Sequence, residues 1–63
     1  MNADEYIKRI GENIVNYRVS KGIRQVDLAV LLNMDDSSLR RIESGRTNPT
    51  VRTLHRIAEA LEI

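Results

Sequence analysis

Apolar residues recur every three or four positions through the first third of the chain, the spacing that places side chains on one face of an α-helix. The set consists of Ile7, Ile10, Ile14 and Tyr17. Acidic residues stand where the first turn would lie, and Lys21-Gly22 provides a stop. The pattern predicts an amphipathic helix from about Ala3 to Ser20.

Gly11 interrupts this predicted helix. Glycine costs about 1 kcal/mol relative to alanine inside a helix. Two interpretations remain open: either a neighbouring backbone passes too close to leave room for a side chain, or the glycine is simply tolerated.

A second apolar-rich segment predicts a helix of about two turns that starts near Gln25. Its apolar residues are Ile23, Val26, Leu28, Ala29, Leu31 and Leu32. This helix must end at Asn33, because asparagine tolerates the left-handed backbone conformation that reverses a chain.

A third helix is predicted from about Asp36 to Ser44, with Gly45 as its C-terminal stop. Its inward residues are Leu39 and Ile42. Asp35 is a good N-cap for this helix, since its carboxylate can accept hydrogen bonds from the amides of Ser37 or Ser38.

The segment RTNPT is a turn by composition, and Thr50 at its end is suited to cap a fourth helix from Val51 to Leu61. The inward set predicted for this helix is Val51, Leu54, Ile57, Ala58 and Leu61.

These elements predict one small all-α domain that spans residues 1–63. The chain has no cysteine, so apolar packing must stabilise it without a disulfide or a zinc site. No apolar run approaches the roughly 20 residues of a membrane span, and the start of the chain lacks the basic and apolar regions of a signal peptide. We therefore expect a cytoplasmic protein with no membrane partner.

Charge is unevenly distributed along the chain. The formal net charge of +1 is not the footprint of a nucleic-acid-binding domain. The segment from Arg18 to Arg56, however, contains eight basic residues and only four acidic ones, while the remaining acids lie near the ends of the chain. The middle of the chain is therefore basic.

Two short helices joined by a tight turn describe a helix-turn-helix. Counted from Gln25, the fifth residue must be small so that the helices cross closely, and the ninth must accept a positive φ; these are Ala29 and Asn33. Five further positions must be apolar to seat the pair on the core. They are Leu28, Leu32, Met34, Leu39 and Ile42.

From about Ile10 to Leu61 the chain resembles the Cro and phage-repressor family of helix-turn-helix DNA-binding domains, also called the xenobiotic-response-element family. The most specific matches are Gln25, Leu28-Ala29, Ile42-Glu43 followed by Gly45, and Asn48-Pro49-Thr50. The resemblance implies a compact lambda-repressor-like bundle of four or five helices, with the helix-turn-helix at the second and third. It also implies a largely buried ion pair between Arg18 and Glu43, which agrees with their positions beside inward residues.

The resemblance also implies which residues meet DNA. Base contacts are expected from Asp36, Ser37 and Arg41, since arginine can bind guanine O6 and N7 in bidentate fashion. Backbone contacts are expected from Arg24, Gln25, Ser38, Arg40, Arg46, Thr47 and Asn48. Gln25 starts a helix, where free amides can hold a phosphate. Arg24 stands where the family more often has a serine or threonine cap.

Asp36 fits this site least well, because a carboxylate is repelled by phosphates. Three interpretations remain open for it: an acid that favours the start of a helix, a reader of the cytosine amino group, or a sign that this surface does not meet DNA.

We expect a sequence-specific transcriptional regulator of a bacterium, phage or plasmid, with double-stranded DNA as its partner. A homodimer on two half-sites about 34 Å apart is expected, because one recognition helix reads few base pairs. Leu61, Ile63 and the apolar residues near Tyr6 are candidates for its interface, or they close the core. Alternatively, the chain is a segment of a longer regulator.

A protein-interaction module of antitoxin-like or coactivator-like type is the alternative function, favoured by the low net charge and Asp36. Nothing indicates an enzyme: the single histidine, His55, has no cysteine or second histidine beside it and no recognisable nucleophile. We expect no metal, no cofactor and no small-molecule ligand.

Overall fold

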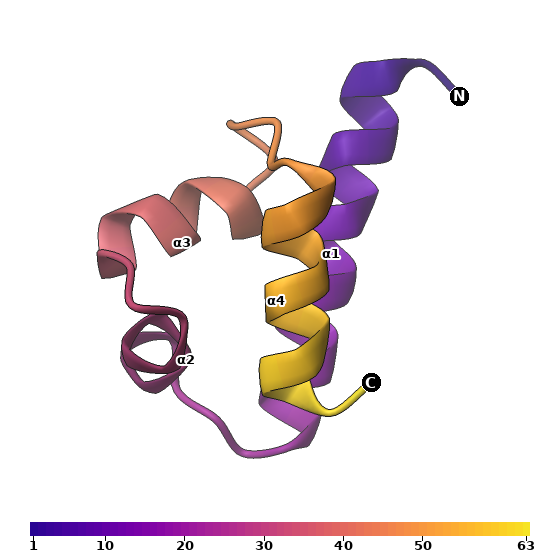
Figure 1. Ribbon diagram of the computed structural model, residues 1–63. Coiled ribbons are helices and arrows are strands. Elements are labelled where there is room, and N and C mark those ends of the chain that lie inside the picture. Colours follow the sequence, from indigo (N-terminus) through magenta and orange to yellow (C-terminus); the bar gives the residue numbers. More distant parts are fainter.

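A computed structural model describes all 63 residues, which form four helices and no strand. The helices are α1 (Ala3–Ser20), α2 (Gln25–Leu32), α3 (Asp36–Glu43) and α4 (Val51–Leu61). Figure 1 shows α4 beside α1, with α2 and α3 on one side of this pair. The predicted all-α fold is confirmed, and each predicted helix is present with bounds that agree to within one residue. None of the four helices combines the length and the apolar character needed to span a bilayer.

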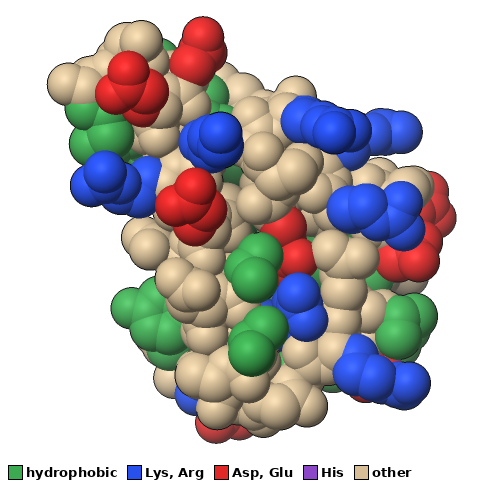
Figure 2. All heavy atoms as spheres, turned by 180° about the vertical axis from the view of Figure 1, so that it is seen from behind, with side chains coloured by type: hydrophobic (Ala, Val, Ile, Leu, Met, Phe, Trp, Pro, Cys, Tyr) green, Lys and Arg blue, Asp and Glu red, His purple; other side chains and the backbone are tan.

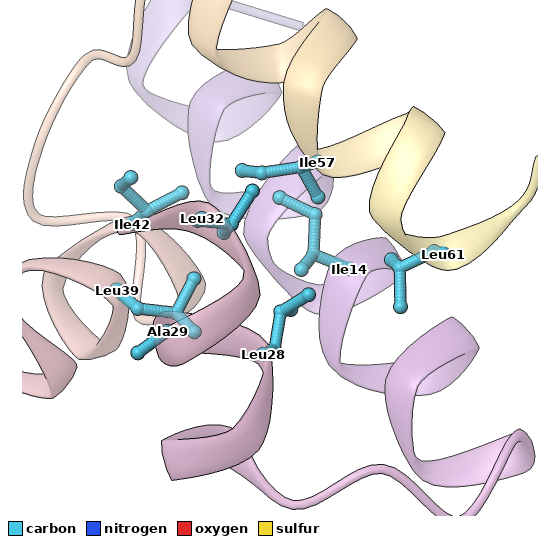
Figure 3. Close-up of a cluster of buried hydrophobic side chains, with 8 residues drawn as sticks. All are labelled: Ile14, Leu28, Ala29, Leu32, Leu39, Ile42, Ile57 and Leu61. Atoms are coloured by element: carbon cyan, nitrogen blue, oxygen red, sulfur yellow. The ribbon is translucent and has the colours of Figure 1, made fainter. Parts of the chain in front are cut away.

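The core is one cluster of eight buried apolar side chains to which every helix contributes (Figure 3). They are Ile14, Leu28, Ala29, Leu32, Leu39, Ile42, Ile57 and Leu61. Met34 packs against this cluster from the turn between α2 and α3. All five positions predicted to seat the helix-turn-helix therefore lie in the core or against it.

Val51, which was predicted to face inward, is exposed, and so are three further apolar residues. Val51 is 83% exposed because it is the first residue of α4 and lies at the end of the core. Val26 and Leu31 are also exposed, since α2 carries apolar residues on every side while only one side packs against the rest of the molecule. Tyr17 is about half exposed near the end of α1. For Val51 the predicted burial was wrong.

The turn between α2 and α3 has the conformation predicted for it. Asn33 adopts the left-handed conformation, with φ 54° and ψ 46°, and Met34 N donates to Ala29 O at 3.0 Å. Arg56 of α4 donates to the Leu32 carbonyl at the end of α2. Because α2 has no basic residue in its own last turn, Arg56 supplies the positive charge that favours a helix C-terminus.

Two glycines let α1 and the end of α3 approach closely. A Cβ on Gly11 would lie 2.5 Å from the carbonyl oxygens of both Ile42 and Glu43. Gly45 has φ +76°, and a Cβ there would lie 2.7 Å from Lys8 Cα. Of the two interpretations of Gly11, the close passage of a neighbouring backbone is the one that the structure supports. The position of α3 on the molecule is therefore fixed by backbone contact with α1.

Candidate nucleic-acid interface

The third helix divides its side chains between the core and the surface. Leu39 and Ile42 are buried, whereas Arg40 and Arg41 between them are exposed. Ser37 and Ser38 in the first turn are half-buried, and Asp36 is exposed. Viewed from the side opposite to Figure 1, basic side chains stand along the edge formed by α2 and α3, with acidic ones beside them (Figure 2). One face of α3 is thus a polar, mainly basic surface.

A hollow of about 230 Å³ lies on this surface, and no apolar residue lines it. Its lining residues are Ser37, Arg40, Arg41, Ser44 and Arg46. Ser44 was not among the residues predicted for the site; its hydroxyl donates to the Arg41 carbonyl at 3.1 Å. Its spacing, four positions after Arg40 and three after Arg41, places it on the same helix face and was the signal that could have indicated it. Three guanidinium groups around a polar hollow suit an anionic or hydrogen-bond-accepting partner.

Asp36 and Arg40 form an ion pair within one turn of α3. Asp36 Oδ2 lies 3.7 Å from Arg40 Nη2, and both side chains are more than half exposed. An exposed pair of this kind contributes little to stability. It does, however, direct the carboxylate along its own helix and partly neutralise Arg40. The first effect reduces the repulsion that Asp36 would exert on a polyanion, whereas the second weakens the attraction of Arg40 for it.

Asp35 occupies the N-cap position of α3, with φ −67° and ψ 144°. Its side chain accepts no capping hydrogen bond, so the predicted bonds from the amides of Ser37 or Ser38 are absent. The N-cap position predicted for Asp35 is observed, but the predicted contact was wrong. Hydrogen bonding depends on a side-chain rotamer that sequence spacing does not fix. By contrast, Thr50 caps α4, accepting a hydrogen bond from Thr53 N at 3.0 Å.

Arg24 stands at the N-cap of α2 without capping it. Its Nε donates to Asp27 Oδ2 at 2.8 Å and its Nη2 to Asp27 Oδ1 at 3.1 Å. These hydrogen bonds lower the pKa of the Asp27 carboxyl and raise the pKa of Arg24. Leu28 is the first residue of α2 whose amide finds a backbone acceptor, so the three amides before it are free for an anion.

Glu43 is the centre of a buried polar network. It is 7% exposed, and Arg18 donates to it twice, through Nε to Oε2 at 2.8 Å and through Nη2 to Oε1 at 3.1 Å. Arg18 Nη1 also donates to the Ile23 carbonyl at 2.9 Å, and Gln25 Nε2 donates to Glu43 Oε1 at 2.8 Å. No buried side-chain polar atom lacks a partner. The ion pair that the family resemblance implied thus links α1 to α3, and Gln25 adds α2.

The loop after α3 continues the basic surface. Arg46 lines the hollow together with Arg40 and Arg41, and its amide donates to the Arg41 carbonyl at 2.9 Å. Asn48 is exposed and Thr47 is half-buried in the same loop. The structure thus brings Ser37, Arg40, Arg41 and Arg46 together in one hollow, while Arg24 and Gln25 lie at the start of a different helix.

Comparisons with known proteins agree with this geometry. The sequence model of the family described as Helix-turn-helix matches residues 14–63. The chain is 36% identical over 56 residues to the uncharacterized HTH-type transcriptional regulator y4dJ of Sinorhizobium fredii, covering 89% of this chain and 73% of that protein. It is 39% identical over 51 residues to the ImmF control region 10 kDa protein of Bacillus phage phi105, covering 81% of this chain and 57% of that protein.

A solved structure has the same fold. It is the crystal structure of the restriction-modification controller protein C.AhdI from Aeromonas hydrophila. The TM-score is 0.89 at 29% sequence identity, and the match covers 94% of this chain and 89% of that one.

Proposed function

The protein belongs to the helix-turn-helix family of Cro and phage-repressor type, and we propose that it regulates transcription by inserting α3 into the major groove of its operator as a homodimer. The observation that carries the proposal is the division of α3 into a buried apolar side and an exposed basic side. An α-helix with its side chains is about 10–12 Å across, and the major groove is about 12 Å wide, so the groove admits it.

Sequence would be read by the outward residues of α3. Arg41 can bind guanine O6 and N7 in bidentate fashion, and Ser37 beside it is small enough to let the helix approach base edges. Asp36 occupies the same end of the helix, but its pairing with Arg40 favours a role within the helix over cytosine readout. We therefore propose Arg41 and Ser37 as the principal base contacts.

The DNA backbone would be held from both sides of α3. On one side of α3, the phosphates would be contacted by Arg40, Ser38 and the loop residues Arg46, Thr47 and Asn48. On the other side, the phosphates would be contacted by Arg24 and by the free amides at the start of α2, including that of Gln25. Such contacts position a protein on DNA without selecting a sequence. Because Asp27 binds Arg24 in the free protein, a phosphate must compete with that carboxylate.

We propose a homodimer because the surface that reads DNA is small. Two half-sites one helical turn apart require recognition helices about 34 Å apart, and a domain measuring 30 × 21 × 18 Å can reach this spacing by pairing with a second copy. Leu61 is buried in the core and cannot serve as the interface, whereas Tyr6 and Ile63 are more than half exposed. We propose residues 1–63 as a single DNA-binding domain; the chain spans 73% and 57% of the length of the two relatives described above.

A selection of bound sequences from random DNA, followed by titration of the selected duplex at several salt concentrations, tests this function. Contact with about six phosphates predicts a slope near −5 in a plot of log affinity against log salt. A flat response, with no sequence enriched, would contradict DNA binding and favour the protein-interaction module. The specific observation behind that second candidate is that Asp27 and Asp36 already pair with Arg24 and Arg40.

A further inference from the structure

Gln25 differs from the other residues proposed to meet DNA, because its side chain is hydrogen-bonded to a buried carboxylate. Its Nε2 donates to Glu43 Oε1 at 2.8 Å, and the Gln25 side chain is half-buried. A hydrogen bond to a carboxylate is about twice as strong as one between neutral groups. A phosphate that drew this donor away would leave the buried Glu43 carboxylate with one partner fewer.

Gln25 and Glu43 also stand at the open end of the helix-turn-helix. Gln25 is the first residue of α2 and Glu43 is the last residue of α3, whereas the turn at Asn33 joins the opposite ends of the same two helices. Helices α2 and α3 are therefore joined by the chain itself at one end and by the Gln25–Glu43 hydrogen bond at the other. Two fixed ends define the angle between the helices.

We propose that Gln25 is a positioning residue for DNA reading: through Glu43 its side chain holds α2 and α3 at the angle that lets both reach DNA together. Only its main-chain amide is then available to a phosphate. This inference rests on the proposed function.

The consequence concerns specificity more than affinity. Specific binding requires Arg41 to meet a base while the start of α2 meets a phosphate, so it depends on the angle between α2 and α3. Non-specific binding uses phosphates in whatever arrangement is available and tolerates a looser angle. Loss of the Gln25 link should therefore reduce discrimination between sequences without removing a phosphate contact.

The test compares Gln25→Met, which keeps the side-chain length but removes the donor, with Arg46→Ala as a control that removes a proposed phosphate contact. Affinities for the selected duplex and for a random duplex are measured at several salt concentrations, at a temperature where circular dichroism shows each variant folded. We expect Gln25→Met to lower the specific-to-nonspecific ratio about five- to twentyfold, the scale of one imperfect base contact, with an unchanged salt slope. Arg46→Ala should reduce the slope by about 1 and leave the ratio unchanged.

A reduced salt slope with an unchanged ratio for Gln25→Met would overturn the inference, because it would make Gln25 a phosphate ligand. An unchanged slope with an unchanged ratio would overturn it as well. A wild-type protein that binds no duplex would refute the proposed function itself, which is a different result from either of these.

A second measurement needs no variant. In NMR spectra of the wild-type protein, the Gln25 side-chain amide signals should be shielded from solvent exchange and should move little when the selected duplex is added. A large shift of these signals together with rapid solvent exchange in the free protein would show that the amide is not held by Glu43.

Discussion

Gly11 of α1 touches the backbone of Glu43 at the end of α3, so closely that a Cβ on Gly11 would lie 2.5 Å from the Glu43 carbonyl oxygen. Gly11→Ala should therefore destabilise the domain by about 1 to 3 kcal/mol, the usual cost of overpacking, although alanine is the better helix former. Urea unfolding followed by circular dichroism measures the change. Asn13→Ala, at an exposed position of the same helix, is the control and should be close to neutral. A Gly11→Ala variant as stable as its control would contradict the observed contact.

Breaking the Arg18–Glu43 ion pair should lower the free energy of unfolding more than Gly11→Ala does. Arg18→Met removes two of the three donors to the Glu43 carboxylate and leaves a buried charge poorly paired, which costs about 3 to 5 kcal/mol. Domains of this size have a total stability of only about 3 to 9 kcal/mol, so partial unfolding is expected at room temperature. The measurement is the thermal melting temperature of Arg18→Met. The control is Arg52→Met, which replaces an exposed arginine of α4 that forms no ion pair. Equal melting temperatures for the two variants would refute the structural role of the pair.

The division between base and backbone contacts can be tested with two arginines that line the same hollow. Arg41→Ala should weaken binding to the selected duplex by about 1 to 3 kcal/mol and leave binding to random DNA nearly unchanged. Arg46→Ala should weaken both by similar amounts. Binding isotherms for the two variants on the two duplexes provide the measurement. Similar losses on both duplexes for both variants would show that the roles are assigned wrongly.

The change in DNA affinity caused by replacing Asp36 distinguishes between its possible roles. Asp36→Asn removes a negative charge from the side that we propose faces DNA and frees Arg40, so affinity should rise for every sequence, and more at low salt. Repeating the selection from random DNA with this variant tests for readout as well. If its preference changes at a single base pair and its overall affinity does not rise, Asp36 reads cytosine instead.

Asp27 should titrate below the ordinary range of an aspartate, because Arg24 hydrogen-bonds its carboxylate and lowers its pKa. A carboxyl with a lowered pKa in the folded state adds stability above the pKa of the unfolded chain and loses it as pH falls through the folded pKa. Since both side chains are exposed, the effect on unfolding should be small. The direct measurement is an NMR pH titration of the Asp27 carboxyl, with Arg24→Gln as the variant that restores the ordinary midpoint. A midpoint unaffected by Arg24→Gln would show that the pair does not persist in solution.

The helices could be predicted from sequence because their ends depend on local chemistry. Asn33 takes the left-handed conformation and Thr50 caps α4, and both effects involve residues within a few positions along the chain. The burial of Val51 was predicted wrongly because periodicity shows which residues share a face but not whether that face finds a partner. In α2 apolar residues occur on every side, so the sequence offers no unique choice.

The outward direction of the α3 arginines could be predicted from their position beside Leu39. Not every contact that modifies the site could be predicted in this way. The Arg24–Asp27 and Asp36–Arg40 pairs have the three- and four-residue spacings of helix neighbours and could have been found from sequence. The Gln25–Glu43 bond joins residues 18 positions apart, and its formation depends on how α2 crosses α3. That angle is a property of the folded core.

On α3 the residues that hold the helix in place and those that face outward do not overlap. Leu39, Ile42 and Glu43 are fixed by the core, by Gly11 and by Arg18, while Ser37, Arg40 and Arg41 have no part in that anchoring. Replacing these outward side chains, which we propose meet DNA, as a set should redirect the protein to another operator, while the side chains that anchor α3 stay unchanged.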